Sequence, residues 1–282
     1  LSNSVILIFV FAGFYMVIKF AVAQSDHRLR IIGGIVGLLL SIALIMGANI
    51  INTDVTLVNS WKTWIKIVLF SPITSACFML VVRLIEKFYL EENCNYEKYN
   101  KKIVFFIIWG VIFLAWIPVF CASYPGIYGY DSIFQTTMYM NGTIETHHPI
   151  AHTYLLGFFV ITIGKNILGS LEKGMALYSL FQMICMSCIF TIIYTYVKKR
   201  TKKIISIILL LVFMFLPVNG IMAVSSTKDI LFAGFFALMI LQFLLVIEDK
   251  EKLKNWKFCV SMIVIPVIGI IFRNQEIYVF VL

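Results

Sequence analysis

The chain has 282 residues, of which 61% are hydrophobic and only 13% are charged, and its mean hydropathy is +0.96. A soluble domain of this size needs far more charge to cover its surface, so the composition excludes an ordinary soluble protein. The formal net charge is +9. The cations stand in short gaps between apolar blocks and form no basic domain, so we expect no nucleic acid among the partners.

Taken in chain order, the apolar blocks have about the 20 residues that cross a bilayer as a helix. Period-2 alternation is absent, and a helix then satisfies every backbone group in lipid. The predicted fold class is an all-α integral membrane protein with about nine transmembrane helices. The expected spans are residues 4–22, 31–50, 63–85, 103–121, 175–197, 204–223, 230–247 and 258–272, and a further apolar run starts at 277.

Most cations stand in a few of the gaps between these blocks. Residues 24–30, 86–102, 198–203 and 248–257 hold 15 of the 23 Lys and Arg residues. The positive-inside rule predicts that all of these gaps are cytoplasmic, so an even number of crossings must separate each from the next. Three apolar blocks lie between the second gap and the third. One of these blocks is therefore expected not to cross.

The block that we expect not to cross is residues 149–168. Its strongly apolar core is only about ten residues long, and Gly157 and Gly164 interrupt it, which is more typical of an interfacial segment. Pro149 suits the first turn of a helix. We therefore predict an extracytoplasmic juxtamembrane helix within one outer loop, residues 123–174.

This topology brings the unusual polar loops onto one side of the membrane. The loop with Asp131, the loop with Lys228 and Asp229, and the segment with Arg273 and Glu276 would all face away from the cytoplasm.

The sequence also suggests a division of the chain. Residues 1–102 hold N-terminal transmembrane helices, and residues 103–282 hold a core with the polar loops. The chain begins without Met and ends inside an apolar run, so we expect a fragment truncated at both ends. The pair Cys185 and Cys188 lies inside an expected span, where small core-type residues are the favoured interpretation.

The first polar cluster is residues 123–135, SYPGIYGYDSIFQ, which opens on turn signals. Its Asp131 is expected to bind a divalent cation, to act as a general base, or to cap the helix that follows. Ser132 and Gln135 would share one face of that helix. Gln135 is therefore a candidate substrate contact.

The second cluster is residues 145–152, ETHHPIAH. His148 and His152 are four residues apart and would meet on one helix face if the helix began early enough. With Asp131 or Glu145 they would form a metal site. Two histidines with unplaced carboxylates are a weak signal for metal, and histidines at the polar edge of an interfacial helix are the favoured interpretation.

Two further clusters stand at the outer ends of spans. Lys228 and Asp229 precede a span, and there Asp229 would either cap the helix and favour its dipole or contact a substrate. Arg273 and Glu276 are three residues apart and could pair with each other. An arginine is also well shaped to hold a phosphate.

In this order, YPGIYGYDS, HHPIAHT, TKD and RNQEIY resemble the GT-C superfamily of polyprenyl-phosphate-dependent glycosyltransferases. They resemble more closely a bacterial group of uncharacterised multispanning proteins. The matching motifs run from Ser123 to Tyr278. The resemblance implies a GT-C-like fold in a bacterial plasma membrane, a membrane lipid carrying the sugar donor as a polyprenyl phosphate, and a glycan or protein acceptor.

Carried over by position, the resemblance implies that Asp131 is the outer-loop acid that acts as general base or metal ligand. It implies that His147 and His148 open the juxtamembrane helix beside the site. Lys228 and Arg273 become candidates for holding the lipid-linked phosphate. Many members of the superfamily carry two adjacent acids where this chain has Asp131 and a serine, which leaves a requirement for Mg²⁺ or Mn²⁺ open.

The leading hypothesis is a membrane glycosyltransferase with Asp131 as the base. Its substrate contacts would be Gln135, His147, His148, Lys228, Asp229, Arg273 and Glu276. The alternative is a transporter or flippase for a lipid-linked or anionic substrate, and a third hypothesis is a non-catalytic assembly subunit. Transporters favour internal repeats and mid-span charges, and the sequence has no evident repeat and few such charges.

Overall fold

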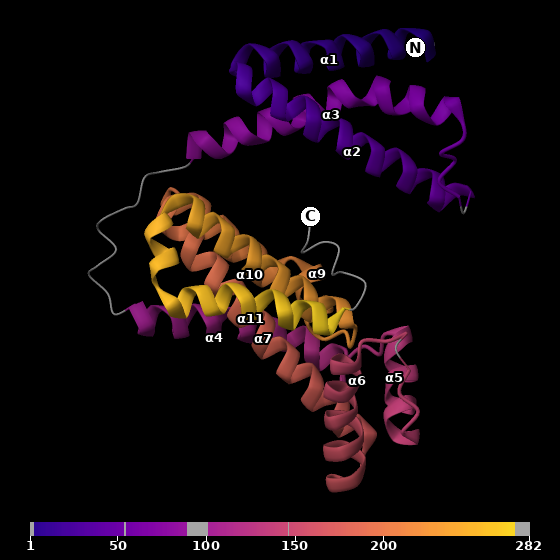
Figure 1. Ribbon diagram of the computed structural model, residues 1–282, viewed down its shortest axis with the longest axis vertical. Coiled ribbons are helices and arrows are strands. Elements are labelled where there is room, and N and C mark those ends of the chain that lie inside the picture. The colour runs from indigo at the N-terminus through magenta and orange to yellow at the C-terminus, as the bar shows by residue number, and fades with distance from the viewer. Residues whose placement is uncertain (1–2, 54, 89–100, 146, 274–282) are drawn as a thin grey trace. The chain divides into compact units, whose positions relative to one another are not determined.

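The computed structural model describes residues 3–53, 55–88, 101–145 and 147–273 (Figure 1). Every regular element in these ranges is a helix, which confirms the predicted all-α class. The chain divides into two compact units, Leu1–Tyr89 and Leu90–Leu282. This division falls within the polar gap 86–102. The boundary predicted from the sequence lies at the end of the same gap, between residues 102 and 103.

The first unit consists of α1 (Asn3–Gln24), α2 (His27–Thr53) and α3 (Trp61–Phe88). Small residues let α2 and α3 pack closely as an antiparallel pair, as they do between helices in membranes. A Cβ on Gly37 would lie 2.5 Å from the backbone nitrogen of Ser75. Buried Ser41 and Thr74 join their hydroxyls at 2.8 Å, and Thr74 also donates to the Gly37 carbonyl at 2.7 Å.

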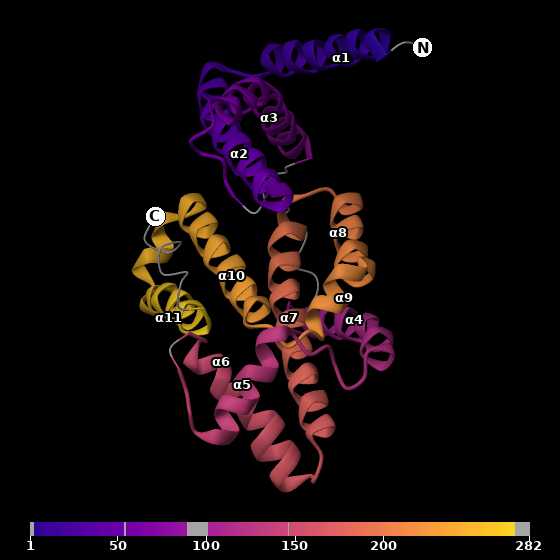
Figure 2. The same ribbon diagram turned by 90° about the vertical axis from the view of Figure 1, so that its right-hand side faces the viewer.

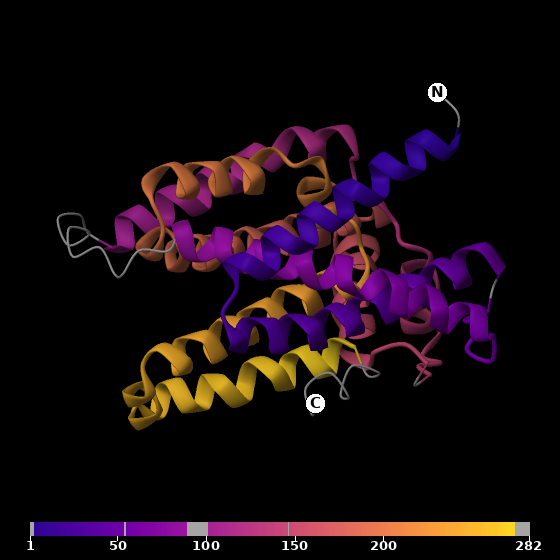
Figure 3. The ribbon, with the colours of Figure 1, turned by 90° about the horizontal axis from the view of Figure 1, so that it is seen from above.

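The second unit is arranged around α7, its longest helix at 30 residues. Its elements are α4 (Lys101–Ala122), α5 (Tyr130–Asn141), α6 (Ile150–Gly157), η2 (Phe158–Ile167), α7 (Leu171–Arg200), α8 (Lys203–Phe215), α9 (Pro217–Ala223), α10 (Lys228–Glu248), η3 (Lys250–Lys254) and α11 (Trp256–Phe272). In Figure 2, α5 and α6 lie near the first half of α7, whereas α8 and α10 lie on either side of its second half. Figure 3 shows α10 and α11 side by side.

The main apolar core of this unit surrounds Trp116 of α4. Ile112, Trp116 and Met183 are almost completely buried, and the Trp116 indole donates to the Phe213 carbonyl at 3.1 Å. These contacts tie α4, α7 and α8 together on the side of α7 away from α5 and α6.

A second close contact joins η2, a π-helix that continues α6 directly, to the start of α7. A Cβ on Gly164 would lie 2.5 Å from the Cα of Gly174, so the two backbones touch where any side chain would separate them. Gly169, at φ +68°, makes the turn between the two helices. Gly157 and Gly164, predicted as interruptions of a short helix, therefore serve helix contacts instead.

Within the described residues, six helices are long and apolar enough to cross a membrane. The pair α8 and α9 would make a seventh span, with a bend of 49°. The protein is therefore a multi-pass membrane protein. The predicted span 204–223 is broken at Pro217, because proline cannot donate to the preceding turn. Ile150–Ile167, which the sequence analysis predicts not to cross, is one of the six by length and composition.

Candidate functional site

The loop before α5 and the loop before α10 are hydrogen-bonded to each other. Ile127 N–H donates to the Val224 carbonyl at 3.0 Å, and Ser226 N–H donates to the Ile127 carbonyl at 2.9 Å. The Ser132 hydroxyl also bonds to Ser226. Gly126 allows the turn, because its φ of +133° is unfavourable for other residues. Two clusters that lie about a hundred residues apart in sequence are thus held together.

Asp131 contacts Lys228 across this junction. Asp131 Oδ2 lies 2.8 Å from Lys228 Nζ, and the two side chains are 38% and 21% exposed. The hydrogen bond from Lys228 holds the pKa of Asp131 below its usual value. Gly129 stands at the N-cap of α5, so the interpretation of Asp131 as a helix cap was wrong and Asp131 lies in the first turn instead.

A second ion pair forms at the same end of α10. Asp229 Oδ1 lies 3.3 Å from Arg273 Nε, and the Arg273 guanidinium lies 5.6 Å from the centre of the Phe232 ring. Phe232 is one helical turn after Lys228, so both cations lie near the first turn of α10. Thr227 is the N-cap residue, so Asp229 stands in the first turn, where its charge suits the helix dipole. The prediction for Glu276 lies outside the described residues.

His147 and His148 lie near Asp131. The His147 and His148 rings meet edge to face, with centroids 5.0 Å apart, and both rings influence the Asp131 carboxylate electrostatically. Burial lowers the pKa of His148, and the charge of Asp131 opposes this effect only in part. His148 is neutral at pH 7 as a result.

His148 and His152 do not pair as one helix face would require. α6 begins at Ile150, after Pro149 as its N-cap, so His148 precedes the helix. His152 is completely buried, so its predicted place at a polar edge was wrong.

A buried row of hydrogen bonds leads away from α5 and fixes His152. His152 Nδ1 lies 2.8 Å from the Gln135 amide, and His152 Nε2 lies 2.8 Å from the Tyr178 hydroxyl. Tyr178 donates in turn to Gln182 Oε1 at 3.0 Å. All of these side chains are completely buried. Tyr178 and Gln182 were missed in the sequence analysis, although buried polar residues within an apolar span are a usual sign of function.

Gln182 sets the direction of these hydrogen bonds. Its Nε2 donates to the carbonyls of Met222 at 3.2 Å, Ala223 at 3.0 Å and Ser225 at 2.8 Å, so its oxygen must face Tyr178. The Tyr178 hydroxyl is therefore a donor to Gln182 and an acceptor from His152. The row thus connects α5 and α7 to the segment that precedes Lys228.

Two buried polar atoms in this region lack a hydrogen-bond partner among the described residues. They are one amide atom of Gln135, which lies one turn after Asp131 on α5, and Nδ1 of His148. Unpaired buried polar atoms cost free energy and are rare, so these two atoms are available to hydrogen-bond a ligand or a water molecule.

The arrangement does not resemble a metal centre. Over the described ranges, no group of three or more His, Cys, Asp and Glu side chains is placed to hold a metal ion. Lys228 contacts one oxygen of the Asp131 carboxylate, and its positive charge would repel a metal cation at the same carboxylate. The possible Mg²⁺ or Mn²⁺ at Asp131 stays a prediction.

The fold and this cluster define the protein as a multi-pass helical membrane protein with paired charges at one end of its larger unit. Residues 139–282 match the model of DUF6020, described as a family of unknown function. The match covers about half of the chain, and the protein belongs to this family. It includes His147, His148, Lys228, Asp229 and Arg273 and begins after Asp131. Neither the curated proteins nor the solved structures compared with the chain gave a significant match.

Proposed function

We propose that the protein is a membrane glycosyltransferase with a GT-C-like fold, which transfers a sugar from a polyprenyl-phosphate donor to a glycan or protein acceptor outside a bacterial plasma membrane. The contact of 2.8 Å between Asp131 and Lys228 carries this proposal. It joins a carboxylate, which can take a proton, to a cation, which can hold a phosphate, and Arg273 supplies a second cation nearby.

In this proposal α6 and η2 lie outside the bilayer, and the contacts along α7 support that. α7 meets η2 near Gly174, the loop after α9 at Gln182, and the last residue of α10 at Arg200. The rise from Gln182 to Arg200 is about 27 Å, close to the thickness of the hydrocarbon core. The first part of α7, with η2 against it, then extends beyond the core on the side of Asp131.

The surroundings of the pair suit a lipid-linked sugar. The donor's isoprenoid tail lies in the outer leaflet, so its phosphate stands at headgroup level. In this topology Lys228, at the start of α10, and Arg273, just after α11, lie at the same level. Tyr130 is 80% exposed beside Asp131, and exposed aromatic rings stack well on sugars. Gln135 and His148 offer unpaired polar atoms for sugar hydroxyls.

The chemical step needs Asp131 as a base. The acceptor oxygen forms a bond to the anomeric carbon, the bond from that carbon to the phosphate oxygen breaks, and polyprenyl phosphate leaves. The acceptor proton passes to Asp131. The pKa of Asp131 is low while Lys228 contacts it. A donor phosphate that draws Lys228 away would therefore raise the basicity of Asp131, so donor binding should precede proton transfer.

The test is transfer from a radiolabelled polyprenyl-phosphate sugar in membranes containing the full chain. We expect Asp131→Asn to reduce transfer at least a hundredfold, since general bases contribute about 10² to 10⁴ in rate. Glu172→Gln is the matched control, because Glu172 is also an acid in the first turn of a helix but lies outside the cluster. Unchanged transfer by the Asp131 variant, with equal protein in the membrane, would rule out the catalytic role.

The break between α8 and α9 favours one alternative, a flippase for a lipid-linked substrate. Broken helices line the substrate path in many transporters, and α8 and α9 are bent by 49°. An apolar cavity of about 220 Å³ lies between α9, α10 and Trp116. The same radiolabel distinguishes the two functions, because a flippase moves the labelled lipid across the membrane without forming a glycosylated product.

A further inference from the structure

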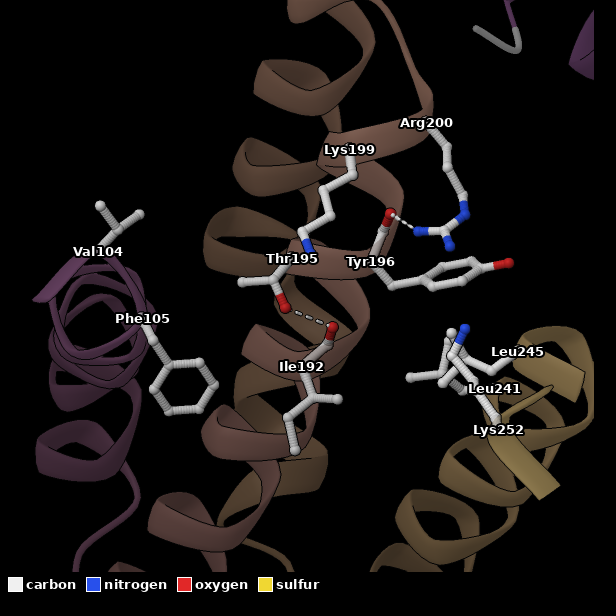
Figure 4. Close-up of a pocket in the computed structure, with 10 residues that line it drawn as sticks. All are labelled: Val104, Phe105, Ile192, Thr195, Tyr196, Lys199, Arg200, Leu241, Leu245 and Lys252. Carbon is white, nitrogen blue, oxygen red and sulfur yellow. Dashed lines mark hydrogen bonds between the residues drawn. The ribbon is translucent and has the colours of Figure 1, made fainter. Parts of the chain in front are cut away.

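A second pocket lies at the opposite, basic end of the larger unit. It has a volume of about 410 Å³ and is lined by α4, α7, α10 and η3. Its walls are largely apolar, and its cations come from α7 and from η3 (Figure 4). The lining residues are Val104, Phe105, Ile192, Thr195, Tyr196, Lys199, Arg200, Leu241, Leu245 and Lys252.

Two of the cations at this pocket are held by acids. Arg200 Nε lies 2.6 Å from Glu248 Oε1, and the Arg200 guanidinium stacks 3.8 Å from the centre of the Tyr196 ring. Lys252 Nζ lies 3.1 Å from Asp249 Oδ2. These pairs fix the rim of the pocket and neutralise much of its charge.

Lys199 is different from these two cations. Within the described part of the chain it makes no ion pair or hydrogen bond, although it is partly buried. Figure 4 shows its side chain running back along α7 towards Thr195, with the ammonium among the pocket residues. A partly buried ammonium beside apolar walls is costly unless an anion joins it.

The pocket has the depth of a lipid headgroup and the start of its chain. From Arg200 to Ile192 the rise along α7 is about 12 Å, which reaches from the headgroup region into the hydrocarbon. Val104 and Phe105 offer the apolar surface that a chain would need.

We propose that this pocket binds an anionic phospholipid of the adjoining leaflet, with its phosphate at Lys199 and the beginning of one acyl chain between α4 and α7. The site is separate from the Asp131 cluster and does not depend on the function proposed for that cluster. The lipid supplies the negative charge that Lys199 lacks, and its chain covers Phe105.

The test is native mass spectrometry of the full chain in detergent, titrated with phosphatidylglycerol or with phosphatidylcholine carrying the same acyl chains. We expect phosphatidylglycerol to bind more tightly, and Lys199→Gln to weaken this binding about fivefold, the usual effect of one lysine near an anionic lipid. Lys203→Gln is the matched control, since Lys203 belongs to the same basic run but does not line the pocket. The Lys203 variant should bind phosphatidylglycerol as tightly as the unchanged protein.

A second variant tests the pocket by shape. Leu245→Trp places a larger side chain on the wall and should weaken binding without any change of charge. Equal losses in the Lys199 and Lys203 variants would show general attraction to a basic surface and overturn the proposal. Displacement of the lipid by millimolar glycerol phosphate would show a site for a soluble anion, and it would overturn the lipid assignment.

Discussion

At the residue scale, Tyr178 is the side chain on which the arrangement of the site depends most. Its hydroxyl stands between His152 and Gln182, and Gln182 holds the carbonyls before Lys228. The sequence predicted that Asp131, Lys228 and Arg273 face one side of the membrane, because the cation-rich gaps fix which loops share a side. It could not predict the buried row of hydrogen bonds, because the hydropathy of a block does not indicate which side chain a buried tyrosine hydroxyl contacts.

Removing the Tyr178 hydroxyl tests this row. Tyr178→Phe leaves a His152 donor and a Gln182 acceptor buried without a partner, which we expect to cost about 1–3 kcal/mol. Tyr139→Phe is the control, because the Tyr139 hydroxyl bonds to Thr162 in a site that is only partly buried. Thermal unfolding in detergent should show a clearly larger loss for Tyr178. Equal losses would mean that the row adds nothing to stability.

The burial of His148 predicts a dependence of stability on pH. The pKa of His148 in the folded protein lies below the usual value of about 6.5. Below pH 6.5 the folded protein therefore binds fewer protons than the unfolded chain. The stabilisation is complete above pH 6.5 and is lost as the pH falls towards the lower folded value. Thermal unfolding at pH 7.5 and 5.5 should show a smaller loss on acidification in His148→Leu than in the unchanged protein. The exposed neighbour provides the control, since His147→Leu should behave like the unchanged protein.

At the element scale, hydropathy predicted most helices and missed what bends or joins them. α10 and α11 follow the predicted blocks closely. The break at Pro217 and the π-helix η2 were missed, because an apolar block looks the same whether its backbone continues or changes. The contact between η2 and α7 was missed for a related reason. A glycine in sequence indicates freedom of the backbone, and only the fold reveals that Gly164 has Gly174 against it.

The contact between these glycines can be tested with single methyl groups. Gly164→Ala places a Cβ 2.5 Å from the Gly174 Cα, so we expect a loss of about 1–3 kcal/mol as the backbones separate. Gly110→Ala is the matched change in α4, where a Cβ meets nothing within 4 Å, and it should be neutral or slightly stabilising. Chemical unfolding of both variants measures the difference, and a neutral Gly164→Ala would contradict the close packing.

At the scale of the whole molecule, the topology depends on whether α6 and η2 cross the membrane. Counting cations at the gaps predicts that α6 and η2 stay outside, whereas length and composition alone admit Ile150–Ile167 as a span. The two arguments differ because neither takes into account the residues that pack against the helix. The extensive contact of η2 with the first part of α7 favours the first argument.

Cysteine labelling of intact cells decides this topology. In a chain whose own cysteines are replaced by serine, Asn141→Cys and Leu168→Cys flank α6 and η2 and both are exposed. We expect an impermeant maleimide to label both from outside, and Lys202→Cys to be labelled only after the cells are opened. Labelling of Asn141→Cys and Leu168→Cys from opposite sides would mean that the helix crosses, and the shared outer face would be lost.

The sequence by itself determined that the protein is helical, embedded in a membrane, and divided into basic ends and polar loops, because hydropathy and charge act locally along the chain. It also named Asp131, Lys228, Asp229 and Arg273. Only the tertiary structure decided that Asp131 meets Lys228 and Asp229 meets Arg273. Those contacts depend on hydrogen bonds between loops about a hundred residues apart, and no local pattern encodes which two loops will touch.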